Sequence, residues 1–354
     1  MYYSTNHLII YQGNYTQEIM DLAKGFATSG VKIVSEFWKP QRTLHVSNAP
    51  SCFREPGILK GYRLTNQSWF YYAKSIFYIH NETFNIWTHL IAFFILWSTL
   101  ARYAFIYDFW TDKRSWPILV FGICCLVSTG VSTLAHIWHS KSPNIHYTVF
   151  LFDYVGASLY GFGSGILALY TFSDDKTYET VETPTFILIW LYAWFDCLTM
   201  CATKVLLDEN SLKRKCSVVG VFILYGFVVT IPVGHRYWTC YNDINCSLTS
   251  LNYISVLYLM FVLQGFTFGS HLPELFLPGV FDILGQSHQW FHLVSTATQV
   301  LQIHTAHFEI KHRQSNHGNP DLNFLILATL LLAICEIISL LVIRRFLPIK
   351  NKKE

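Results

Sequence analysis

Seven long runs of apolar residues limit most strongly what this chain can fold into. They cover residues 84–106, 116–138, 147–172, 185–203, 218–234, 251–268 and 322–343. Each approaches the roughly 20 residues that a helix needs to cross the hydrocarbon core of a bilayer. Charged residues make up only 13% of the chain, against about 25% in a soluble globular protein. The sequence therefore predicts an all-α integral membrane protein.

A further span is expected at residues 286–307, although it is diluted by polar side chains. These are Ser295, Thr296, Thr298, Gln299, Gln302 and His304. Polar groups are costly in lipid, so we expect this face to turn toward the interior of the bundle. The prediction is a seven-helix core at 81–310, then a loop and an eighth, C-terminal transmembrane helix at 311–346. A region at 1–80, with an amphipathic helix expected at 18–37, precedes the core, and a basic tail follows at 347–354.

The distribution of lysine and arginine predicts that both termini are cytoplasmic. The segments between spans alternate between the two sides of the membrane. Those on the same side as the N-terminus carry more lysine and arginine, and the positive-inside rule places the more basic side in the cytoplasm. The opposite orientation remains an alternative, because Asn14, Asn66 and Asn81 begin formal glycosylation triplets that would be usable only outside.

With a cytoplasmic N-terminus, the loop that contains Cys240 and Cys246 faces outward. The two cysteines could close this loop with a disulfide, and Asn245 between them begins another glycosylation triplet.

The charge of the chain argues against a nucleic-acid partner. The formal net charge is only +3, and the basic residues gather at membrane edges rather than in a stripe. We expect a multi-pass protein of the plasma membrane. The lysines at 350, 352 and 353 also resemble a dilysine retrieval signal, which would indicate the endoplasmic reticulum or Golgi, although a basic end that binds anionic lipid is the commoner explanation.

Three histidines predict a metal site near the cytoplasmic face. His288 and His292 lie one helical turn apart, and the expected topology places His136 at the same membrane depth. Three imidazoles with an open fourth position are the usual plan of a catalytic Zn²⁺ site. Two other interpretations remain open: a closed zinc site that only joins helices, or histidines that merely hydrogen-bond neighbouring helices.

Two further residues are candidates for catalysis at the same depth. Asp153 lies in the first turns of the third span, and Ser132 precedes His136 by one turn. Asp153 could orient a water that the metal activates and accept its proton, while Ser132 could orient that water or a substrate oxygen. An unliganded buried carboxylate favours an open site over a purely structural one.

Other polar residues in apolar surroundings are interpreted as structural. Glu82, Asn85 and His89 share one helical face and predict a hydrogen-bonded clamp between helices rather than metal ligands. Asp196 and Glu336 are single acids that could contact a ligand but are more simply paired with a buried polar side chain.

Several ordered motifs resemble those of the progestin and adiponectin receptor (PAQR) family. They are Arg54-Glu-Pro with Gly61-Tyr-Arg63, His80-Asn-Glu-Thr-x-Asn85-x-Trp-Thr-His89, Ser132-x-x-x-His136, Asp153-Tyr-x-Gly156, and Ser287-His-Gln-x-Phe-His292. The resemblance implies a seven-helix zinc-containing core with a cytoplasmic N-terminus. In that core His136, His288 and His292 would be ligands, with Asp153 and Ser132 beside them.

Within this family, Ser270-His-Leu-Pro-Glu274 and the extra C-terminal span look most like the membrane progestin receptor branch, although Leu275 replaces the usual arginine. The resemblance implies a receptor that binds a steroid or another lipid, such as a sphingolipid, within the helix bundle and signals through a heterotrimeric G protein. The alternative is an intramembrane zinc hydrolase of a lipid amide, similar to a ceramidase.

Overall fold

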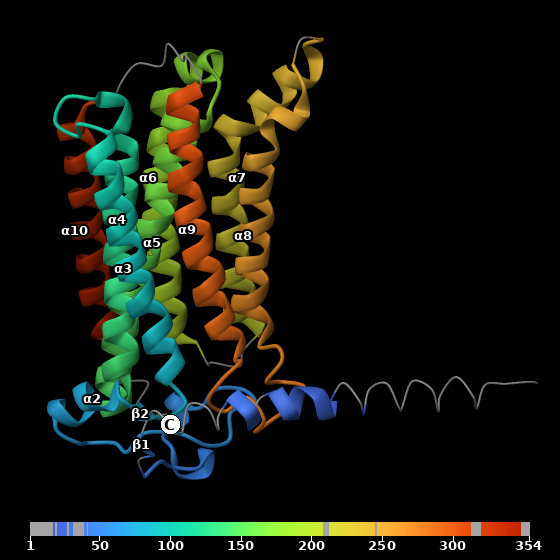
Figure 1. The fold of residues 1–354 in the computed structure, drawn as a ribbon. Coiled ribbons are helices and arrows are strands. Elements are labelled where there is room, and N and C mark those ends of the chain that lie inside the picture. The colour runs from blue at the N-terminus through green and yellow to red at the C-terminus, as the bar shows by residue number, and fades with distance from the viewer. Residues whose placement is uncertain are drawn as a thin grey trace, which may run out of the picture.

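Eight long helices, side by side, form the body of the protein. The structure is a computed structural model that describes residues 42–207, 212–244, 246–312 and 320–347, together with 17, 20–26, 28–30 and 39–40. The long helices in these ranges are α3 (Thr83–Ile106), α4 (Trp116–Trp138), α5 (Pro143–Leu167), α6 (Asp175–Leu206), α7 (Leu212–Asn242), α8 (Asn252–Ser270), α9 (Ser287–His312) and α10 (Leu322–Arg344). Figure 1 shows that they run roughly parallel or antiparallel, so the chain passes from one end of the bundle to the other with each helix.

Capping residues explain where several of these helices begin. Pro143 is the first residue of α5, where its missing N–H costs nothing, and the preceding Ser142 side chain accepts a hydrogen bond from the first turn. Pro117 has a similar position in α4. Asp321 accepts two backbone N–H groups at the start of α10. Capping residues therefore determine where these helices begin, which the apolar runs alone do not define.

The most closely packed helix pair is α4 and α5. A glycine of α5 permits this approach: a Cβ added at Gly156 would lie 3.0 Å from the Cα of Ser128 on α4. Small residues have the same role at many transmembrane helix contacts. On the other sides of this pair, α10 packs on α5 and α6, and α9 packs between α3 and α8.

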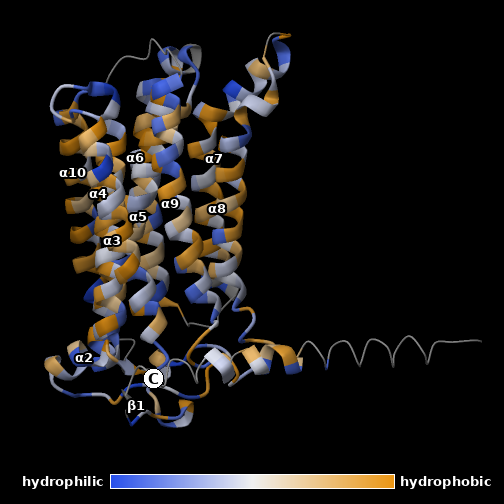
Figure 2. Ribbon diagram, in the orientation of Figure 1, coloured by the Kyte–Doolittle hydropathy of each residue, from blue (hydrophilic) through white to orange (hydrophobic). Residues whose placement is uncertain are grey.

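Seven helices of the described chain are long and apolar enough to cross a membrane, namely α3–α8 and α10 with their short flanking turns. The expected count of eight spans is not reached by this criterion, because α9 has the length, 26 residues, but not the apolarity. Figure 2 shows the difference, with hydrophobic colours along α10 and many hydrophilic positions along α9. The protein is therefore a multi-pass membrane protein with seven candidate spans.

The region before α3 forms a layer at one end of the bundle. It contains β1 (Lys39–Pro40), which pairs in parallel with β2 (Tyr78–Ile79), the short turns η1 (Val46–Asn48) and η2 (Ser51–Phe53), and α2 (Trp69–Ser75). Of the amphipathic helix expected at 18–37, residues 20–26 and 28–30 are helical, and the rest of that range lies outside the described residues. Gly57 in this layer has a φ of +78°, and a Cβ there would lie 2.2 Å from the Glu274 carbonyl oxygen. The loop between α8 and α9 thus packs directly on the layer.

Short helical turns lie next to several of the long helices. They are η3 (Lys113–Ser115), η4 (His139–Lys141), the π-helical turn η5 (Ala168–Phe172) and η6 (Leu248–Leu251). A disulfide joins Cys240 to Cys246 between α7 and η6, as the sequence suggested. Asn245 and the tail beyond 347 lie outside the described residues.

Candidate metal centre

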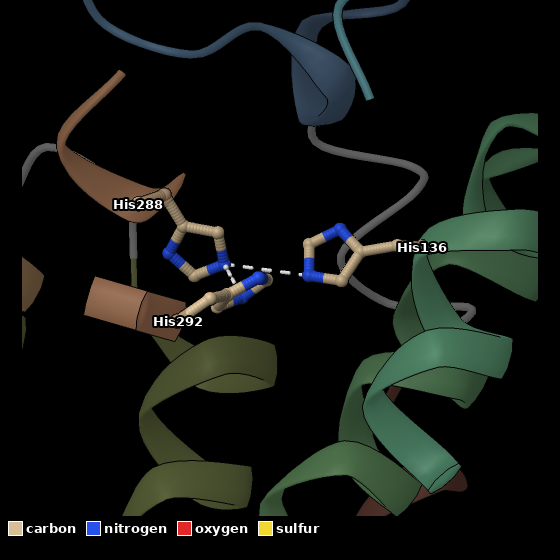
Figure 3. A group of neighbouring side chains, drawn as sticks. All are labelled: His136, His288 and His292. Carbon is tan, nitrogen blue, oxygen red and sulfur yellow. Dashed lines mark hydrogen bonds between the residues drawn. The ribbon is translucent and has the colours of Figure 1, made fainter. Parts of the chain in front are cut away.

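Three imidazoles from two distant segments meet at the end of the bundle that carries the N-terminal layer. His136 lies in the last turn of α4, while His288 and His292 lie in the first two turns of α9. The Nε2 atom of His288 is 3.3 Å from Nε2 of His136 and 3.1 Å from Nε2 of His292. Figure 3 shows the three rings converging on one point. One nitrogen from each ring lies within 4.8 Å of the others.

This spacing fits a metal ion better than it fits hydrogen bonds. Four ligands arranged tetrahedrally at zinc–nitrogen distances of about 2.0–2.1 Å lie about 3.3–3.4 Å from one another. The two measured separations, 3.3 and 3.1 Å, are close to that value. Where the Nε2 atoms of His136 and His292 both keep their lone pairs, Nε2 of His288 cannot satisfy both by hydrogen bonding, because it carries at most one proton. The three residues together could therefore hold a metal ion.

A contact on the far side of the His136 ring determines which of its two nitrogens faces the other histidines. Its Nδ1 atom lies 2.8 Å from a carboxylate oxygen of Glu82, at the start of α3. A carboxylate accepts and cannot donate, so Nδ1 carries the proton and Nε2 keeps its lone pair. Carboxylates hold metal-ligating histidines in this way in many metalloproteins.

His292 is oriented by a hydroxyl instead of a carboxylate. Its Nδ1 lies 2.9 Å from Oγ1 of Thr88 on α3. That hydroxyl donates its own hydrogen to the backbone oxygen of Phe84, at 2.7 Å, so it accepts the proton of His292 Nδ1. The Nε2 lone pair of His292 is again left for the centre. The sequence motif that ends at His89 contained Thr88 but did not reveal this contact.

Glu82 is the hub of a buried polar network, in agreement with the predicted clamp between helices. Besides His136, its carboxylate accepts from the side-chain amides of Asn85, at 2.9 Å, and Asn81, at 3.2 Å. The ring of His89 packs on that of His292, with centroids 3.6 Å apart, but His89 does not join the three-histidine group. The clamp therefore ties α3 to both halves of the centre.

A fully buried arginine holds the end of α4. The guanidinium of Arg63 donates to the carbonyl oxygens of His136, at 2.6 Å, and Ile137, at 2.8 Å. A cation at a helix C-terminus satisfies carbonyls that lack partners within the helix and favours the negative end of the helix dipole. Burial lowers the pKa of Arg63 to about 10, so the side chain remains a cation at neutral pH. The sequence motif contained Arg63 but did not reveal this role.

The start of α9 is held in a similar way from the α8–α9 loop. The carboxylate of Glu274 accepts the backbone N–H of Ser287, at 2.8 Å, and also its hydroxyl. An acid at this position satisfies a free N–H group and favours the positive end of the helix dipole. Both segments that carry the clustered histidines, the end of α4 and the start of α9, are thus fixed by charged side chains.

The two residues predicted to be catalytic lie beside His136 rather than within the three-histidine group. Asp153 on α5 interacts electrostatically with His136 and through its side chain with Ser132, one turn before His136 on α4. Ser132 is buried. The predicted neighbourhood of these two side chains and His136 is therefore present, while their catalytic roles stay a prediction.

These features define the class: a multi-pass helical membrane protein with a buried three-histidine centre at one end of its bundle. The comparisons with known proteins agree. A profile described as haemolysin-III related matches residues 77–303, so the chain belongs to that family, which includes the progestin and adiponectin receptors.

Similar proteins come from the progestin receptor branch of the family. Human membrane progestin receptor alpha is 29% identical over 276 residues, 78% of this chain and 79% of the relative. The alpha receptor of Cynoscion nebulosus is 34% identical over 269 residues, 74% and 76%. Human membrane progestin receptor beta is 31% identical over 310 residues, 83% and 84%.

Proposed function

We propose that this chain is a membrane receptor that binds a steroid or a related lipid and that carries Zn²⁺ at His136, His288 and His292. The observation that supports the metal most directly is the convergence of the three imidazoles: Nε2 of His288 lies 3.1 Å from that of His292 and 3.3 Å from that of His136, and one ligand atom from each ring lies within 4.8 Å of the others. The names of the relatives, membrane progestin receptors alpha and beta, support a steroid as ligand. Signalling through a heterotrimeric G protein from the plasma membrane is part of the same proposal.

Zinc suits this donor set because three neutral imidazoles are borderline ligands, which magnesium and calcium disfavour. When bound, the metal would join α4 to α9 and could polarise an oxygen atom at its fourth position. Glu82 and Thr88 would keep the two outer imidazoles in the tautomer that binds. In the absence of the metal, the same residues would still hold the rings close together.

In the bilayer we propose that α9 is an eighth crossing and that the N-terminus is cytoplasmic. Most of the polar side chains in the middle of α9 are turned inward, which lowers the cost of placing this helix in a bilayer: Ser295, Thr298, Gln299 and Gln302 are buried, whereas Thr296 and His304 are more exposed. Gln302 hydrogen-bonds Ser164 on α5 at 3.1 Å. The metal centre would then lie near the cytoplasmic face.

A second candidate function, hydrolysis of a lipid amide such as ceramide, is favoured by one observation. Asp153 lies next to His136 and Ser132 at the edge of the centre, where a carboxylate could accept a proton during catalysis. A receptor with a structural metal has no need of this group.

One set of measurements on the full-length purified protein in nanodiscs separates the two functions. Metal content, saturable progesterone binding and ceramide turnover are compared in the wild type and in Asp153→Ala. Steroid binding that survives the substitution, without turnover in either protein, supports the receptor. Turnover that disappears in Asp153→Ala while zinc is retained supports the hydrolase and contradicts the primary proposal.

A further inference from the structure

A groove on the lipid-facing side of the bundle lies close to the metal centre. Its volume is about 820 Å³, within the range of small-molecule sites. One wall comes from α3, with Ile91 and Ile95, the other from α8, with Met260, and Leu293 and Ala297 of α9 form its floor. Ile91 is 51% exposed and Leu293 48%, so the groove opens laterally toward the bilayer rather than toward water.

The polar side chains of the groove are unevenly available to a ligand. Thr88 and Thr296 lie at the end near the metal, and each hydroxyl already donates its hydrogen to a backbone carbonyl, of Phe84 and His292 respectively. His304 lies at the far end, with Nδ1 2.6 Å from the hydroxyl of Tyr103. With the phenol as donor to Nδ1, the neutral imidazole carries its proton on Nε2, where it can serve a ligand.

We propose that this groove is the binding site for the steroid-type ligand, with a ligand carbonyl at Nε2–H of His304 and the apolar ring system along α9. This inference rests on the proposed receptor function and assigns its site. From Leu293 to His304 the groove follows about 16 Å of helix, a length suited to fused rings with a substituent at each end.

The chemistry of the lining favours a neutral ligand over the charged lipids of the bilayer. No lysine, arginine, aspartate or glutamate belongs to the lining of this groove as described. A fatty acid would bring a carboxylate without a cation to pair with it, and such burial is costly. A neutral steroid such as progesterone brings a large apolar area that matches the apolar walls, and one of its ketone oxygens can accept a hydrogen bond from His304.

The groove also has a direct connection to the metal centre. Thr88, which lines it, accepts the hydrogen bond from Nδ1 of His292. A ligand that packs against Thr88 therefore touches the residue that orients one metal ligand. Occupancy of the groove and the geometry of the centre are linked through a single side chain.

The test measures binding of radiolabelled progesterone to the purified, zinc-loaded full-length protein in nanodiscs, with zinc content determined on the same samples. Ala297→Trp fills the floor of the groove. Ala104→Trp makes the same change at an exposed alanine of α3 that does not line it, and serves as the matched control. We expect at least a tenfold loss of affinity in Ala297→Trp, none in Ala104→Trp, and unchanged zinc in both.

A second variant tests the proposed hydrogen bond without filling space. His304→Phe should weaken progesterone binding about three- to tenfold, the usual worth of one hydrogen bond. A steroid that lacks the ring ketone should bind the wild type less tightly by the same factor. Its affinity should not change in His304→Phe, and a double-mutant cycle over ligand and protein measures this coupling.

The contrary results distinguish the groove assignment from the receptor function. Wild-type affinity in Ala297→Trp would overturn the groove assignment and leave the receptor function standing. A phospholipid that co-purifies in the groove and is not displaced by steroid would overturn it as well. Failure of the zinc-loaded wild type to bind any steroid would overturn the receptor function itself.

Discussion

Replacing Glu82 with glutamine should weaken zinc binding by about 10- to 100-fold. The carboxylate accepts from His136 Nδ1 at 2.8 Å and from the amides of Asn85 and Asn81 at 2.9 and 3.2 Å. A glutamine has one acceptor oxygen, so its NH₂ group would face another hydrogen-bond donor, either Nδ1–H of His136 or the amide of Asn85 or Asn81. Losing a hydrogen bond to a charged group costs about 1.5–3 kcal/mol, and this range corresponds to the stated change in affinity.

Competition with a chelator of known affinity, on purified protein in nanodiscs, measures the effect. Glu336→Gln is the matched control, because Glu336 is another buried acid, hydrogen-bonded at 2.5 Å to Ser158 between α10 and α5 and absent from the three-histidine group. The control should change thermal stability without changing zinc affinity. Zinc affinity of Glu82→Gln within twofold of the wild type would refute the role given to this carboxylate.

Three further outcomes are expected. Arg63→Lys should lower stability by about 2 kcal/mol, measured by chemical unfolding, because an ammonium cannot span the two carbonyls of His136 and Ile137; a neutral result would contradict the capping role. Gly156→Ala should cost about 1–3 kcal/mol, since its Cβ meets α4, whereas Gly220→Ala, with nothing within 4 Å, should be neutral or stabilising by up to about 1 kcal/mol; equal effects would argue against close α4–α5 packing. Metal removal by a strong chelator should lower the unfolding temperature of the wild type, and an unchanged temperature would show that the metal does not join α4 to α9.

The sequence allowed the helices to be predicted where hydropathy alone decides. Seven apolar runs correspond to seven candidate spans. The helix α9 is different, because composition does not say which face is buried. Its polar residues are unfavourable in lipid and acceptable in the bundle, and only packing against α3 and α8 distinguishes the two environments.

The clustering of the three histidines was also predictable, for a topological reason. A helix places His288 and His292 one turn apart, and alternating spans bring the end of α4 to the same end of the bundle. The supporting contacts were not predictable in this way. The hydrogen bond from His292 to Thr88 depends on how α3 and α9 are rotated about their axes, and hydropathy carries no information on that rotation.

Elemental analysis combined with zinc X-ray absorption on the intact purified protein decides whether His136, His288 and His292 hold a metal ion. We expect one zinc per chain with three nitrogen ligands at about 2.0–2.1 Å, and loss of that signal in His288→Ala. Absence of stoichiometric zinc from the wild type, or an unchanged nitrogen shell in His288→Ala, would contradict it.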